Sequence, residues 1–68
     1  MMDFGAWVKH QLKKKNMTQT ELALRADIDP TKISRYTRGE IDLRLSTMLR
    51  IVHALGKRIV FEDDPNAG

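Results

Sequence analysis

The stretch TQTELALRADIDPTKISRYTRGE, residues 18–40, contains two short helical patterns with almost nothing between them. Thr18 and Glu21 have the spacing of a capping box, in which each side chain satisfies the other residue's backbone amide at the start of a helix. The sequence therefore predicts a helix from about Gln19 to Arg25, with an apolar side that faces inward.

A second helix begins only a few residues later, with two start signals in succession. Asp29 is a capping residue, and Pro30 is preorganised for the first helical position. We expect this helix to cover residues 30–37, with Gly39 as its stop. The short turn before it requires a positive φ at Asp27, which Asp tolerates better than most residues. Two helices joined by about three residues at a steep angle form a helix-turn-helix motif.

The rest of the chain predicts two further helices and one strand. Asp3 caps a helical pattern over residues 3–15, and a second apolar stripe, over residues 45–55, ends at Gly56. Residues 57–62, KRIVFE, are rich in β-branched and aromatic side chains, which favours a strand. Such a strand has no partner inside a four-helix domain, so it either pairs with its twin in a second copy or forms a disordered tail. The predicted fold class is therefore all-α, with a helix-turn-helix domain (1–56), a short C-terminal β-strand (57–62) and a flexible tail (63–68).

Length and composition limit the classes of protein to consider. A chain of 68 residues without cysteine cannot use disulfides or thiolate ligands, so packed helices and a dimer are the remaining means of reinforcement. His10 and His53 lie far apart with no carboxylate at ligand spacing, so we expect no metal and no cofactor. No apolar stretch approaches the roughly 18 residues of a membrane span. Without a signal peptide at the N-terminus, we expect a soluble, cytoplasmic protein.

The distribution of charge suggests a nucleic-acid partner. All 12 Lys and Arg residues lie at or before Arg58, against six acids in the same range, which gives residues 1–58 a formal charge of +6. Glu62, Asp63 and Asp64 make the remainder −3. A basic body with an acidic tail fits nucleic-acid binding, and a solvated charged surface is the alternative explanation. The chain has no nucleophile–base pair and no Gly-rich phosphate loop, so we do not expect an enzyme.

The helix-turn-helix geometry gives the polar residues of helix 30–37 a role. In this motif the first helix lies across the phosphates, and the second places its N-terminal side chains in the major groove of double-stranded DNA. Thr31, Lys32 and Arg35 are expected to point outward, whereas Ile33 and Tyr36 are expected to point into the core. Arg35 is the strongest candidate for a bidentate contact with guanine. RNA binding is disfavoured because no aromatic platform on a sheet is predicted.

Two segments together resemble a known family: MTQTELALRADIDPTKISRYTRGE, and LSTMLRIVHALGKRI further along the chain. They are similar to the Cro/C1-type (XRE) helix-turn-helix proteins, which include phage repressors and many antitoxins. The resemblance covers about residues 4–58 and implies a compact four-helix, lambda-repressor-like DNA-binding domain. It rests on Thr-Gln opening the second helix, Leu22-Ala23, Ile28, Ile33-Ser34, Arg38-Gly39, and the Leu-Gly that closes the fourth helix.

The resemblance also implies roles for individual residues. Gln19 matches a glutamine that braces a phosphate and touches the recognition helix, and Thr18 and Arg38 match phosphate-clamping positions. The positions that reach base edges, or lie beside those that do, are matched by Pro30, Thr31, Lys32, Ser34 and Arg35. Pro30 departs from the family pattern, because it cannot hydrogen-bond a base; contact with a thymine methyl group is a substitute.

The predicted function is that of a sequence-specific transcription regulator, a repressor that binds a two-fold operator as a homodimer. One such motif touches too few base pairs alone, so two copies bind half-sites a helical turn apart. The dimer interface is predicted on the outer face of the fourth helix and on the C-terminal strand, at Met48, Val52, Ile59, Val60 and Phe61. The alternative is an antitoxin that neutralises a toxin protein, with autoregulatory DNA binding as a second activity.

Overall fold

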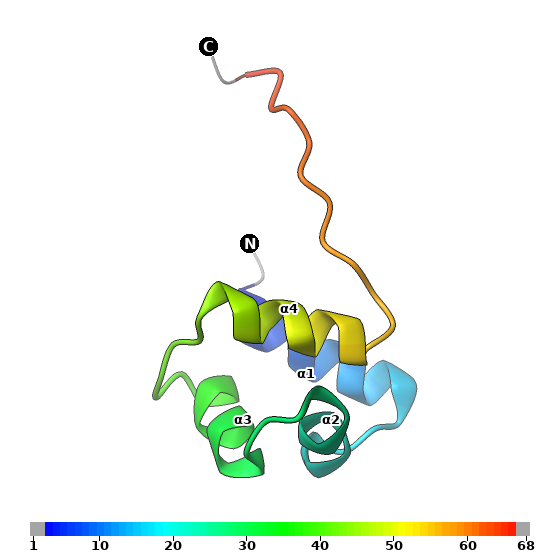
Figure 1. Ribbon diagram of the computed structural model, residues 1–68, viewed down its shortest axis with the longest axis vertical. Coiled ribbons are helices and arrows are strands. Elements are labelled where there is room, and N and C mark those ends of the chain that lie inside the picture. Colours follow the sequence, from blue (N-terminus) through cyan, green and yellow to red (C-terminus); the bar gives the residue numbers. More distant parts are fainter. Residues whose placement is uncertain (1–2, 67–68) are drawn as a thin grey trace.

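The computed structural model describes residues 3–66, and Figure 1 shows the arrangement of its helices. In chain order they are α1 (Phe4–Lys15), α2 (Gln19–Ala26), α3 (Pro30–Thr37) and α4 (Leu45–Ala54). The all-α, four-helix prediction is confirmed, and α3 has the predicted bounds. The first two residues of the predicted domain and the last two of the predicted tail lie outside the described residues.

Capping side chains start three of these helices. Asp3 accepts a hydrogen bond from the backbone N–H of Ala6 at 2.7 Å, and Asp29 accepts one from Thr31 at 2.9 Å. Caps of this kind stabilise a helix by about 1 kcal/mol each. The starts of α1 and α3 are therefore determined by residues that directly precede them.

The capping box at the start of α2 is only half formed. Thr18 Oγ1 accepts from the Glu21 N–H at 3.0 Å, as predicted. The Glu21 carboxylate, however, pairs with Arg25 one turn later, at 3.0 Å, instead of returning to the Thr18 backbone. An ion pair between residues i and i+4 competes for the same carboxylate, so the reciprocal half of the predicted box is wrong.

The helices end at residues with positive φ. Asp27, at φ 57°, confirms the left-handed conformation expected in the turn between α2 and α3. Gly39 and Gly56 have φ values of 78° and 73° after α3 and α4, where glycine carries no steric penalty. These stops keep the connections short, so α2 and α3 remain close neighbours.

The core lies between all four helices. Its buried members are Val8, Leu12, Leu22, Ala23, Ala26, Ile33, Ile51 and Leu55. Helix α2 contacts both α3 and α4, and α1 contacts α3. Burying a Val, Leu or Ile side chain is worth roughly 1.5–3 kcal/mol, so the helix that carries Leu22 organises the whole domain.

Aromatic side chains join α1 to α3 at the edge of this core. Phe4 stacks on Trp7 with ring centroids 5.6 Å apart, and Tyr36 lies tilted against Phe4 at 5.9 Å. All three rings are only partly buried. The inward orientation expected for Tyr36 is therefore met at the rim of the core rather than at its centre.

Residues 57–66 run away from the side of the molecule formed by α2 and α3 (Figure 1). The structure contains no strand within residues 3–66, so the strand predicted at residues 57–62 is absent from the single chain. A strand needs backbone partners, and a four-helix domain offers no sheet edge. Residues 57–62 have a strand-forming composition but form an extended segment without regular structure.

Candidate nucleic-acid interface

A side-chain hydrogen bond joins α2 to α3, and a second bond within α3 orients its acceptor. The side-chain amide of Gln19 donates to Thr37 Oγ1 at 3.3 Å, and this hydroxyl donates to the carbonyl of Ser34 at 2.9 Å. The resemblance implied the contact of Gln19 with the recognition helix but did not identify Thr37 as its partner. Thr37 is buried one turn beyond Ile33, on the inward side of α3. A polar residue at a core position was the signal available for it.

Arg50 of α4 holds the turn between α2 and α3. Its Nε donates to the Ala26 carbonyl at 3.1 Å, and its guanidinium also donates to the Asp27 carbonyl and lies 3.5 Å from the Asp27 carboxylate. The last carbonyls of a helix lack intrahelical partners, and a cation favours the negative end of the helix dipole. Arg50 therefore supports the base of the helix-turn-helix unit, a role that sequence reasoning missed.

The outward face of α3, continued by the C-cap residue Arg38, carries three of the predicted site residues. Thr31, Arg35 and Arg38 recur at a spacing of four and then three residues, which places them on one side of a helix, and all three are exposed. The buried Ile33 and Thr37 occupy the opposite side. Arg38 pairs with the exposed Glu40, so this carboxylate competes with any phosphate for it. The face is cationic, accessible and attached to a fixed helix.

The other predicted DNA-binding residues surround this face. Thr18 is exposed at the start of α2, and Gln19 and Ser34 are partly buried between α2 and α3. Lys32 is exposed on the flank toward α4, where it lines a polar hollow with Arg44, Ser46 and Thr47. The structure thus places a cation on each of two sides of α3.

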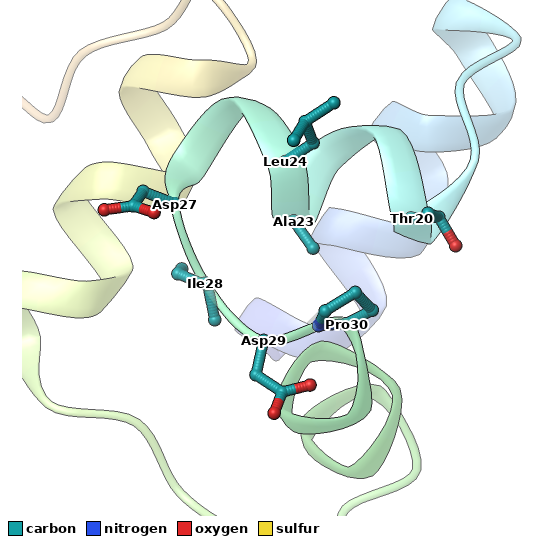
Figure 2. Close-up of a pocket in the computed structure, with 7 residues that line it drawn as sticks. All are labelled: Thr20, Ala23, Leu24, Asp27, Ile28, Asp29 and Pro30. Carbon is teal, nitrogen blue, oxygen red and sulfur yellow. The ribbon is translucent and has the colours of Figure 1, made fainter.

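Pro30 lies on the side of α3 that faces α2. It lines a hollow with Ala23 and the exposed Leu24, and Figure 2 shows the proline ring directed toward Ala23. Asp27 and Asp29 contribute to the same hollow. The structure therefore does not group Pro30 with Thr31 and Arg35.

Burial raises the pKa of Tyr36, and the nearby carboxylates of Asp3 and Asp42 raise it further. Both effects follow from the position of Tyr36 at the rim of the core, where its ring packs against Phe4. A neutral phenol there fits a packing role better than a contact with phosphate.

The five residues predicted at the dimer interface differ widely in exposure. Val52 is only 3% exposed, and Met48 and Ile59 are partly buried. Val60 and Phe61, by contrast, are 62% and 82% exposed on the C-terminal segment. Most of the apolar surface available from this set therefore lies beyond the end of α4.

Two features of the described residues bear on membrane insertion and metal binding. Between residues 3 and 66, no helix is long and apolar enough to cross a membrane. In the same range, no three or more His, Asp or Glu side chains gather at a point where they could hold a metal ion.

A helix-turn-helix family model matches residues 8–61, which is most of the chain. Neither the comparison with curated proteins nor that with solved structures gives a match. The matched region contains α2, α3 and the turn between them, the elements from which the interface is built. The chain belongs to the Cro/C1-type helix-turn-helix family of DNA-binding regulators.

Proposed function

We propose that this protein is a transcription repressor that binds a two-fold operator as a homodimer, with α3 in the major groove. The observation that carries the proposal is the exposed face of Thr31, Arg35 and Arg38 on a helix whose opposite side is buried. The major groove admits one α-helix and presents a distinct pattern of donors and acceptors for each base pair. A helix fixed by its neighbours can read that pattern in a single orientation.

Within this arrangement Arg35 reads a guanine and Thr31 reads a base edge or a thymine methyl group. Thr18 and Arg38 contact phosphates on either side of the groove and set the register of the protein. Gln19 performs two tasks, because its amide has two N–H donors and only one is bound to Thr37. The second N–H remains for a phosphate oxygen.

In this proposal, repression follows from occupancy of the operator. Two copies related by a two-fold axis contact half-sites about 34–36 Å apart, and a promoter covered in this way is closed to polymerase.

The test is selection of bound sequences from random DNA duplexes, followed by affinity measurements on the selected site. Arg35→Ala should weaken binding by about 1–3 kcal/mol and relax the preference at one base pair of each half-site. Arg25→Ala is the matched control, because it removes one exposed cation from the end of α2 instead. Equal losses for both variants, or selection of no common sequence, would contradict sequence-specific reading by α3.

The second candidate function is that of an antitoxin. The observation in its favour is that Val60 and Phe61 are exposed on an extended segment, which could add to the sheet edge of another protein. A toxin gene beside the gene for this chain, and loss of neutralisation on removing residues 57–62, would support this role. Neutralisation that persists without the segment would contradict it.

A further inference from the structure

The C-terminal segment has a charge pattern that complements itself. Residues 57–63 read KRIVFED, with two cations, three apolar residues and two acids in succession. If two copies run antiparallel, the basic end of one lies beside the acidic end of the other. Opposite charges facing each other across two strands stabilise the pair, and like charges destabilise it.

The structure leaves this segment free to pair. The Lys57 N–H donates to the Val52 carbonyl at 3.0 Å and fixes the point at which the chain leaves α4. From there, the backbone of residues 58–63 forms no hydrogen bond with the rest of residues 3–66. Val60 and Phe61 are largely exposed, and unpaired apolar strand-formers of this kind act as a template for another strand.

An apolar groove lies beside the start of the segment. Phe4 and Trp7 of α1 and Val52 of α4 line it, together with Lys57, Arg58 and Ile59 of the segment itself. Its volume is about 270 Å³, which exceeds the roughly 150 Å³ of an apolar cavity that accepts a benzene molecule. The groove is thus large enough for one phenyl ring.

Symmetry limits the ways in which two identical segments can pair. In an antiparallel pair, residues directly opposite each other point to the same face of the sheet. A two-fold axis between the strands also leaves the side chains of residues with the same number on the same face in both copies. The axis must therefore pass between two residues of the same number. A centre at Ile59 places Arg58 opposite Val60, and a centre at Phe61 places Val60 opposite Glu62. Only a centre at Val60 matches every charge with its opposite.

We propose that two copies of this chain pair antiparallel through residues 57–63, with Val60 opposite Val60. Arg58 then lies opposite Glu62, Lys57 lies opposite Asp63, and Ile59 lies opposite Phe61. In the paired strand, alternation places Lys57, Ile59 and the partner's Phe61 on the face toward the groove, and it turns Arg58, which lines the groove in the single chain, to the opposite face. The partner's Phe61 fills the groove over Phe4, Trp7 and Val52. This inference rests on the proposed homodimer and assigns its register and its apolar contact.

Cysteine substitution tests the register, since the chain has no cysteine of its own. Val60→Cys should form a disulfide-linked dimer under mild oxidation, because residues directly opposite lie within disulfide reach. Glu62→Cys alone should remain unlinked, because its twin lies four positions away along the pair. A mixture of Arg58→Cys and Glu62→Cys chains should yield the linked heterodimer. Linkage of Glu62→Cys with itself, or none for Val60→Cys, would overturn the proposed register.

Charge reversal provides an independent readout by sedimentation equilibrium. Arg58→Glu and Glu62→Arg should each weaken self-association about tenfold or more, since each places like charges opposite on both sides of the axis. An equimolar mixture should recover association as a heterodimer. Phe61→Ser should weaken the dimer and also raise the exposure of Trp7, seen in its fluorescence. A wild-type chain that stays monomeric, or a mixture that fails to associate, would contradict the pairing.

Both sets of variants leave α2 and α3 untouched, so DNA reading is tested separately. A linked Val60→Cys dimer that binds no selected DNA would argue against the repressor and not against the register. A chain that stays monomeric but still binds half-sites with the preference set by Arg35 would argue against the pairing and not against DNA reading by α3.

Discussion

The helix-turn-helix unit and the C-terminal segment differ in where their polar groups find partners. In the unit, Thr18, Gln19 and Asp29 all hydrogen-bond within the chain, and Arg50 binds the carbonyls that α2 leaves open. In residues 58–63, the backbone has no such partner among the described residues. The first region is thus complete in one chain, whereas the second has the composition of a strand without a neighbour.

The difference shows which sequence signals determine a local structure within a single chain. A cap or a left-handed turn acts within a few residues of itself, so the chain realises it without help. Strand propensity is realised only against a second strand. Under the proposed dimer, the extended segment becomes a strand when it meets a second strand, and its charge pattern matches that of a second copy of this chain.

The largest effect should come from the core that makes the first region complete. Leu22→Ala should destabilise the domain by about 2–5 kcal/mol, because it removes a fully buried side chain and leaves a cavity. A domain of this size is stabilised by roughly 5 kcal/mol or less, so much of the population should unfold at room temperature. Circular dichroism during chemical denaturation measures this.

Leu24→Ala is the control on the same helix. Leu24 is 81% exposed beside the hollow shown in Figure 2, so its removal should change the unfolding free energy by less than about 0.5 kcal/mol. A large loss at Leu24, or a small one at Leu22, would mean that α2 packs in another orientation.

Arg50→Ala should have the next largest effect, on both folding and DNA binding. Its side chain is about half exposed, so the loss of its hydrogen bonds should cost about 1 kcal/mol of stability. Affinity for DNA should fall by roughly fivefold, the equivalent of about 1 kcal/mol. Its dependence on salt should not change, because a supporting residue releases no counterions on binding.

The salt dependence separates support from direct contact. Arg44→Ala is the matched variant, since Arg44 lies at the start of α4 and makes no capping hydrogen bond with its side chain. If Arg50 touches a phosphate instead, Arg50→Ala should lower the slope of log affinity against log salt by about one. Fluorescence anisotropy at several salt concentrations distinguishes the two results.

Most of the fold could be predicted from the sequence, because the starts and ends of its helices are determined by residues close to them in the chain. The Asp29-Pro30 start of α3 and the positive φ at Asp27 followed directly from the preferences of those residues. The Glu21 side chain was assigned incorrectly, since Arg25 one turn away competes for the same carboxylate. Sequence spacing identifies the candidates for a hydrogen bond but does not rank them.

The parts of the site that escaped prediction depend on contacts between distant residues. Arg50 reaches the α2–α3 turn across more than twenty positions of sequence, and Gln19 reaches Thr37 across 18. Neither pair has a local spacing that would reveal it. The outward face of Thr31 and Arg35, in contrast, was predictable because one helix period determines it.

A smaller effect is expected from the titration of Tyr36. Burial and the carboxylates of Asp3 and Asp42 raise its pKa in the folded state. Its contribution to stability is therefore fully present below the unfolded pKa of about 10 and is lost as the pH rises through the folded value. Thermal unfolding between pH 9 and 11 should show a steeper loss for the wild type than for Tyr36→Phe. Equal slopes would mean that the ring is solvated.

The smallest effect on the fold should come from removing residues 60–68. Ile59 remains in the groove, and none of residues 60–66 belongs to the core, so dilute protein should unfold at an unchanged temperature. At high concentration the two chains should diverge. The full chain should gain stability with concentration, because association favours the folded state, whereas the shortened chain should not. A shortened chain that unfolds earlier even when dilute would show that the segment completes its own domain, and that the two regions are less independent than their hydrogen bonds indicate.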